Sequence, residues 1–200
     1  MFHFSLRSAL LTTTLLGASL ALPCSGVAAG DLESRLAAGE IVLTTRSVAG
    51  CELPEATLTA VIDAPPAKVW KIVEDCNSYS RTMVRIAESK EVARNGNVSQ
   101  CKVTIDMPFP ISNLTSIAEA TSTAGPPQWK RQWKLVSGDY KRNEGAWTLT
   151  AFDAEGTKTR VQYRVLADPN VTVPNYVIRK AQESALPDMI KKMRTILTGK

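Results

Sequence analysis

The chain has 200 residues, of which 44% are hydrophobic and 22% are charged, and its formal net charge is +5 at pH 7. These values are ordinary for a soluble globular protein of one domain, and they exclude a collagen, a disordered tail and a polytopic membrane protein. The chain has a single histidine, His3, and it stands almost at the amino terminus.

Residues 1–29 have the features of a secretory signal peptide. A short basic start that includes Arg7 precedes an apolar run at 8–22, and small residues end at Ala29, as signal peptidase requires. The run is shorter than the roughly 20 residues that a membrane-spanning helix needs. We therefore expect cleavage near Ala29 and export to the periplasm or the outside of the cell. The alternatives are an uncleaved anchor and lipidation of Cys24, which a poor lipobox precedes.

Cleavage after Ala29 would remove His3 and leave a chain without histidine. Such a chain cannot use a Ser-His-Asp or Cys-His catalytic arrangement, or a zinc site with histidine ligands. Acid–base chemistry would fall to carboxylates, lysines or tyrosines. We expect no metal and no cofactor.

Three cysteines would remain after cleavage: Cys51, Cys76 and Cys101. An oxidising compartment favours a disulfide, and three thiols allow one bridge and one leftover thiol. We expect Cys76 to pair with Cys101, which would close a loop of about 25 residues and stabilise the fold by about 3 kcal/mol. Three unpaired thiols are the alternative.

The amino-terminal half of the chain alternates short helices with strands. A helix is predicted at 31–39, with Asp31 as its N-cap and Gly39 as its stop. An edge strand at 41–46 and a core strand at 57–63 follow. Two short helices come after this first core strand, and the first of them opens at Pro65-Pro66, because proline is tolerated in a first turn.

The pattern then changes to alternation with a period of two, which is typical of strands. Short turns, among them Asn95-Gly96, join the expected strands into an antiparallel meander. The predicted strands are 86–93, 98–107, 111–121, 128–136, 140–152 and 157–166. A long helix with an apolar stripe follows at 174–197, and Pro187 inside it should kink it.

A meander of this length twists and curls, so its concave face needs a cover. The C-terminal helix is the only predicted element long enough to provide one. The expected fold is therefore α+β, in one domain, with a curved antiparallel sheet wrapped around the C-terminal helix.

Five short stretches occur in an order that is fairly specific for one fold. They are VIDAPPAKVW at 61–70, GAWTL at 145–149, TRVQY at 159–163, DP at 168–169 and LPDM at 186–189. Together they resemble the START-like superfamily, which includes polyketide cyclases, coenzyme Q-binding proteins and lipid-transfer START domains. The resemblance implies a helix-grip domain at 56–198, after an N-terminal extension at 30–55. It also implies a cavity between helix and sheet that holds an apolar molecule.

The strand at 128–136 carries the most informative site prediction. Trp129, Arg131 and Trp133 alternate with polar residues, so Arg131 should point inward between two tryptophans. A buried, unpaired guanidinium costs several kcal/mol and needs a partner. Arg131 could receive a polar head group or carboxylate of the ligand. The alternatives are a local bulge in the strand and a structural ion pair with Glu119 or Glu144.

Two further segments allow two interpretations each. The strand at 111–121 mixes polar and apolar residues without a dry face, so it either gives a partly hydrated pocket its polar lining or lies at an edge beside solvent. Tyr140, Asn143 and Glu144 follow a turn. They either rim the entrance or are solvated loop residues.

We predict an exported, non-catalytic protein that binds or transfers a hydrophobic small molecule, such as a lipid, sterol, quinone or polyketide-like compound. For each predicted ligand-binding residue, plain core packing is the alternative. These residues are Val103, Ile105, Met107, Trp129, Arg131, Trp133, Trp147, Leu149, Tyr163, Ile178 and Met189.

Two other function classes remain open. One is an enzyme of the cyclase, dehydratase or isomerase type, which needs a cavity carboxylate with a raised pKa, and the candidates are Asp106 and Glu119. The other is an interaction module with a filled interior. We expect a monomer that makes transient contact with a membrane surface, and no nucleic-acid partner, since basic runs and exposed aromatic ladders are missing from the sequence.

Overall fold

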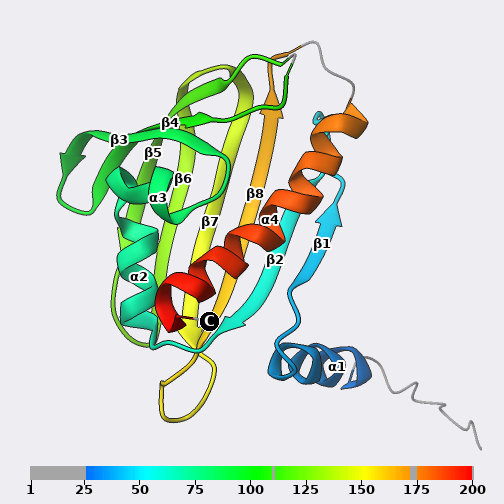
Figure 1. Cartoon of the computed structure of the whole chain (residues 1–200), viewed down its shortest axis with the longest axis vertical. Coiled ribbons are helices and arrows are strands. Elements are labelled where there is room, and N and C mark those ends of the chain that lie inside the picture. The colour runs from blue at the N-terminus through cyan, green and yellow to red at the C-terminus, as the bar shows by residue number, and fades with distance from the viewer. Residues whose placement is uncertain (1–25, 110, 172–174, 200) are drawn as a thin grey trace, which may run out of the picture.

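The computed structural model of the chain describes residues 26–109, 111–171 and 175–199 (Figure 1). The elements of the amino-terminal half are α1 (Gly26–Ala37), β1 (Val42–Arg46), β2 (Glu55–Ile62), α2 (Pro66–Glu74), the 3-10 helix η1 (Cys76–Ser78) and α3 (Tyr79–Thr82). Those that follow are β3 (Ile86–Asn95), β4 (Val98–Ile105), β5 (Leu114–Thr123), β6 (Gln128–Gly138), β7 (Tyr140–Ala151), β8 (Thr159–Pro169) and α4 (Asn175–Thr198).

The strands form one antiparallel sheet of eight strands in the order β1-β2-β8-β7-β6-β5-β4-β3. Strands β3 to β8 are the predicted meander, and β2 pairs with β8 through a register that includes Leu58 opposite Tyr163. The sheet curves, and α4 lies across its concave face with α2 beside it (Figure 1). The predicted helix-grip fold is therefore confirmed.

The main core lies at the β2 side of the sheet. Alternation along β2 buries Leu58, Ala60 and Ile62 completely, and the apolar face of α2 buries Val69 and Val73. These side chains pack with the buried residues of β7, β8 and α4 in one cluster. The buried members of this cluster do not come from β3 to β6, so the concave surface of those strands is free to form a different kind of interior.

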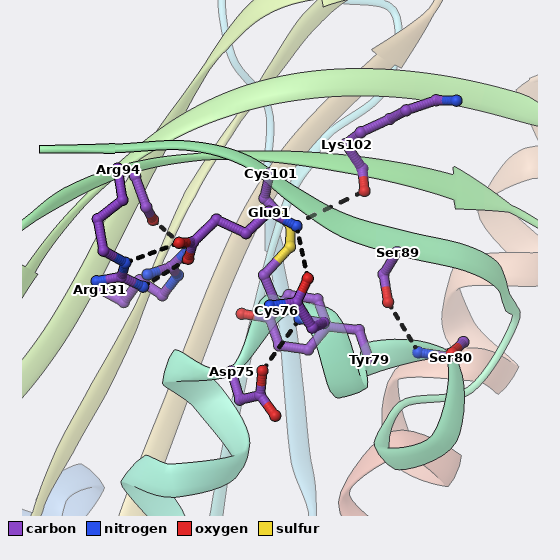
Figure 2. Close-up of a disulfide and its surroundings, with 12 residues drawn as sticks. Asp75, Cys76, Tyr79, Ser80, Ser89, Glu91, Arg94, Cys101, Lys102 and Arg131 are labelled. Carbon is purple, nitrogen blue, oxygen red and sulfur yellow. Dashed lines mark hydrogen bonds and ion pairs between the residues drawn. A yellow bond between two sulfur atoms is a disulfide. The ribbon is translucent and has the colours of Figure 1, made fainter.

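A disulfide links Cys76 at the start of η1 to Cys101 on β4, with the two Cα atoms 6.2 Å apart (Figure 2). The predicted pairing is confirmed, and it ties the short helices to the far side of the sheet. Cys51 carries the free thiol of the described chain, and its Sγ accepts a hydrogen bond from the Arg142 guanidinium at 3.1 Å.

One prediction about local structure was wrong. Helix α1 begins before Asp31, so Asp31 lies inside the helix, 3.8 Å from Arg35, and does not cap it. The preceding Val27-Ala28-Ala29 can continue a helix. Of the two interpretations of the strand at 111–121, the edge position is excluded, because β5 pairs with β4 and β6.

The predicted leader falls largely outside the described residues. His3, Arg7 and Cys24 all lie there, so the cleavage site stays a prediction. Strand β1, from the segment predicted as an extension, pairs with β2. No helix in the described ranges combines the length and the apolar character needed to cross a bilayer.

Candidate functional site

A cavity of about 280 Å³ lies between the concave face of the sheet and α4. Its walls are mostly apolar and come from the strands β4 to β8, the segment 79–86 and the first half of α4. The volume is close to the lower end of the range for small-molecule sites, about 300–1,000 Å³. The interior on this side of the sheet is therefore hollow.

Most of the predicted ligand-binding residues lie on the cavity wall. Those that line it are Val103, Ile105, Met107, Arg131, Trp133, Trp147, Tyr163, Ile178 and Met189. Trp129 and Leu149 do not. They are paired with each other across β6 and β7, and Leu149 is completely buried in the main core. The alternation of residues correctly predicted that Trp129 and Leu149 lie on the same face of the sheet as the cavity residues. It could not show that the cavity ends before it reaches these two positions.

Arg131 points inward as predicted, and only 3% of its surface is exposed. Its guanidinium donates hydrogen bonds of 3.0 Å to the hydroxyl oxygens of Ser122 and Ser99. The expected structural partners were wrong. Glu119 is exposed and accepts a hydrogen bond from Gln100, and Glu144 pairs with Arg142. Each of these carboxylates therefore has a partner other than Arg131.

The inward face of β5 supplies polar groups to the interior. Ser116 and Ser122 are buried on this face together with Leu114 and Ala120. The Ser116 hydroxyl accepts a hydrogen bond of 3.1 Å from the Asn143 side chain, whose Oδ1 accepts one of 3.1 Å from Trp133 Nε1. This chain of hydrogen bonds fixes the orientation of Trp133 in the wall. The polar-lining interpretation of this strand is supported by Ser116, the one hydroxyl of β5 among the described residues of the cavity wall.

Tyr140 and Asn143 belong to β7 and line the cavity, whereas Glu144 does not. Sequence reasoning left these residues undecided and did not predict the contact between Asn143 and Ser116. The available signal was weak: β5 alternates serine with larger residues, and serine occurs both in pockets and at exposed edges.

Aromatic rings form one side of the cavity. The Tyr163 ring lies 5.7 Å from the Trp133 ring and 4.4 Å from the Trp147 ring, between ring centres. Burial raises the pKa of the Tyr140 hydroxyl to about 12 and also raises the pKa of Tyr163. Both hydroxyls therefore stay protonated at neutral pH. Neither has a hydrogen-bond partner in the described part of the chain, so both are available to a polar atom of a ligand.

The carboxylates needed for a cyclase-type reaction are poorly placed. Asp106 is the one carboxylate among the described residues of the cavity lining, and it is exposed. Glu119 lies on the outer face of β5. The cavity thus presents to a ligand a mostly apolar wall with aromatic rings, neutral hydroxyls and one buried cation.

The family model described as polyketide cyclase / dehydrase and lipid transport matches residues 62–194. No curated protein matches the chain. Among solved structures, the STAR-related lipid transfer protein from Xanthomonas axonopodis is 21% identical, with a TM-score of 0.69, covering 78% of this chain and 93% of that one.

Two other similar structures carry different names. Human StAR-related lipid transfer protein 5 is 10% identical, with a TM-score of 0.69, covering 86% of this chain and 93% of its own. An aromatase/cyclase from Streptomyces is 12% identical, with a TM-score of 0.55, covering 72% and 91%. At these identities the likeness shows the shared fold.

Proposed function

Because the chain belongs to the family described as polyketide cyclase / dehydrase and lipid transport, we propose that it binds a hydrophobic small molecule in this cavity and carries it unchanged. The observation that carries the proposal is the hollow, mostly apolar space of about 280 Å³ between the sheet and α4. Burying an apolar ligand there gains about 25 cal/mol per Å² of surface removed from water. The tyrosine hydroxyls and Arg131 would orient its polar atoms.

The carrier role is favoured over catalysis by the position of the carboxylates. A general acid with a raised pKa needs burial, and Asp106 is exposed at the rim. A carrier needs only a cavity that excludes water and an opening through which the ligand passes.

A carrier must also exchange its ligand, and a membrane surface is the source we propose. Phe109 is 97% exposed and Tyr176 is 71% exposed, and each is close in the sequence to cavity residues, Met107 and Ile178. The basic residues Arg179 and Lys180 are exposed on α4 beside Tyr176. Apolar and basic side chains together favour contact with anionic lipid.

We further propose that the protein acts as a monomer after export. The signal-peptide pattern of residues 1–29 supports the export. The disulfide between Cys76 and Cys101 fits an oxidising compartment.

The first test is direct. Protein purified from its own host is examined by native mass spectrometry and extracted with organic solvent, and we expect a co-purifying apolar compound. In parallel, the methyl ester of dansyl-undecanoic acid is titrated into the delipidated protein. Because Trp133 and Trp147 line the cavity, binding should quench tryptophan fluorescence and increase dansyl emission.

A pair of variants locates the binding site. Ala185 lines the cavity, whereas the adjacent Ser184 is exposed on α4. Ala185→Phe should weaken binding of the ester at least tenfold by filling the space, and Ser184→Phe should leave it unchanged. Equal binding by both variants, or no binding by the wild-type protein together with an empty extract, would contradict the proposed function.

A further inference from the structure

The buried charge of Arg131 is not matched by a carboxylate of its own. The side chain is only 3% exposed and lines the cavity, and its guanidinium donates hydrogen bonds to the neutral hydroxyls of Ser99 and Ser122. It also interacts with the neutral hydroxyl of Tyr79. Throughout the described ranges, no acidic oxygen lies within 4.0 Å of this guanidinium. Neutral hydroxyls accept hydrogen bonds from the guanidinium, but they do not neutralise its positive charge.

Glu91 on β3 interacts electrostatically with Arg131, but this carboxylate is already paired with another arginine. Both Glu91 carboxylate oxygens accept hydrogen bonds from Arg94, at 2.8 and 2.6 Å. Figure 2 shows this pair near the disulfide, with Arg131 close to it. The hydrogen bonds of Arg94, together with the positive charge of Arg131, hold the pKa of Glu91 below its usual range. Arg94 therefore takes up both oxygens of the Glu91 carboxylate. Glu74 and Asp75 also lie within electrostatic reach of this cluster, but no carboxylate of the described chain contacts Arg131 directly.

A guanidinium held away from water interacts most strongly with a carboxylate, through charge-assisted and often paired hydrogen bonds. An uncompensated buried charge is unfavourable, so an anion that reaches it gains more than the same anion would gain at a solvated arginine. The rest of the wall is apolar and aromatic, so the matching ligand has an apolar body and one carboxylate.

We propose that the ligand is an amphipathic carboxylic acid, such as a free fatty acid or an aromatic acid, whose carboxylate binds the Arg131 guanidinium while its body fills the cavity. This inference rests on the proposed function and names the ligand class for the same site. Neutral lipids and esters would bind more weakly, because they cannot offset the charge.

The test compares dansyl-undecanoic acid with its methyl ester at neutral pH, where the acid is ionised. The wild-type protein should bind the acid about 10- to 100-fold more tightly than the ester, the range expected for a hydrogen bond to a charged group. Arg131→Gln should remove this preference, so that the variant binds the acid no more tightly than it binds the ester. Lys130→Gln is the matched control, since Lys130 is adjacent on β6 and exposed on the opposite face.

A second variant keeps the test decisive if Arg131→Gln does not fold. Glu91→Gln removes the carboxylate that partly offsets Arg131, so it should strengthen acid binding several-fold and leave ester binding unchanged. Equal affinity of the wild-type protein for acid and ester, or a preference that Glu91→Gln does not increase, overturns the inference while the proposed function stands. Binding of neither probe counts against the proposed function itself.

Discussion

Single residues decide how the aromatic wall of the cavity packs. Gly145 lies directly opposite Trp133 in the β6–β7 pairing. A Cβ atom at Gly145 would collide with the Trp133 ring and with the backbone carbonyl of Arg164. Glycine is thus required because β8 and the tryptophan ring approach it closely, although its φ angle is not in the left-handed region.

We expect Gly145→Ala to lower the free energy of unfolding by about 1–3 kcal/mol, the usual cost of overpacking a well-packed interior. The Trp133 ring would have to move, so binding of the dansyl ester should weaken as well. Chemical denaturation followed by tryptophan fluorescence measures the stability, and titration of the ester measures the binding. Gly30→Ala is the control, because no atom lies within 4 Å of a Cβ built there, and an unchanged Gly145→Ala would contradict the close packing.

Tyr140 gives the protein a predictable sensitivity to alkali. A tyrosine in the unfolded chain ionises near pH 10, whereas burial raises the pKa of Tyr140 to about 12. The native state therefore binds more protons than the unfolded state between these values, and stability falls as pH rises. The contribution is complete below pH 10 and is lost by about pH 12, and it amounts to roughly 3 kcal/mol.

The measurement is the free energy of unfolding as a function of pH for wild type and Tyr140→Phe. The variant should lose less stability across this window, but not become insensitive, because burial raises the pKa of Tyr163 in the same direction. Parallel curves for the two proteins would show that Tyr140 is solvated in the native state.

At the scale of elements, the sequence predicts most of this fold because its signals are local. The alternation of Val161, Tyr163 and Val165 identifies β8, and the proline-opened apolar stripe with Val69 and Trp70 identifies α2. Their order and short turns then define the antiparallel meander, since few other topologies join strands through such short connections.

What the sequence could not predict depends on contacts between distant segments. The prediction that Arg131 points into the interior was correct, but its partners Ser99 and Ser122 come from two other strands, β4 and β5. A serine in the sequence does not indicate which face of a strand it occupies. The prediction that Trp129 lines the cavity failed for a similar reason. Alternation with a period of two shows which face of β6 the residue occupies, but it does not show where along the strand the cavity ends. Both depend on strand register and sheet curvature, which are properties of the assembled sheet.

The disulfide is the covalent link between two elements at the cavity end that holds Arg131. It joins η1 to β4 across a sequence separation of 25 residues, which corresponds to about 3 kcal/mol of loop-closure entropy. We expect reduction to lower the free energy of unfolding of the wild-type protein by about 2–4 kcal/mol.

The readout is denaturation with and without reductant. A Cys76→Ala, Cys101→Ala double variant should be insensitive to reductant, and Cys51→Ser should respond like wild type, because Cys51 is free. A Cys51→Ser variant that no longer responds to reductant would show that a different bridge forms in solution.

At the scale of the whole molecule, the interior has a solid part and a hollow part. The packed core lies over β2 and the adjoining parts of β7 and β8. The cavity is lined by β4 to β8, by the segment 79–86 and by α4 from Ile178 to Met189. In the native state a bound ligand would complete the interior on the hollow side. Any ligand that binds only the folded chain then adds stability that grows with the logarithm of its concentration.

A larger side chain that fills the cavity should therefore stabilise the ligand-free protein and weaken ligand binding. In Ala185→Phe the added ring would take up apolar space that belongs to the cavity, so the ligand-free variant should be more stable than ligand-free wild type by about 0.5–2 kcal/mol. The dansyl ester, which should raise the melting temperature of wild type, should then have no effect on the variant.

Ser184→Phe is the control that distinguishes the effect of filling the cavity from a general effect of a phenyl ring on α4, because Ser184 is exposed. That control should keep wild-type stability and the full rise in melting temperature with the ester. If Ala185→Phe were destabilised and still stabilised by the ester, the probe would bind elsewhere and the hollow side would not be its site. A carrier with a preformed cavity should therefore show higher stability and weaker binding in Ala185→Phe, and neither change in Ser184→Phe.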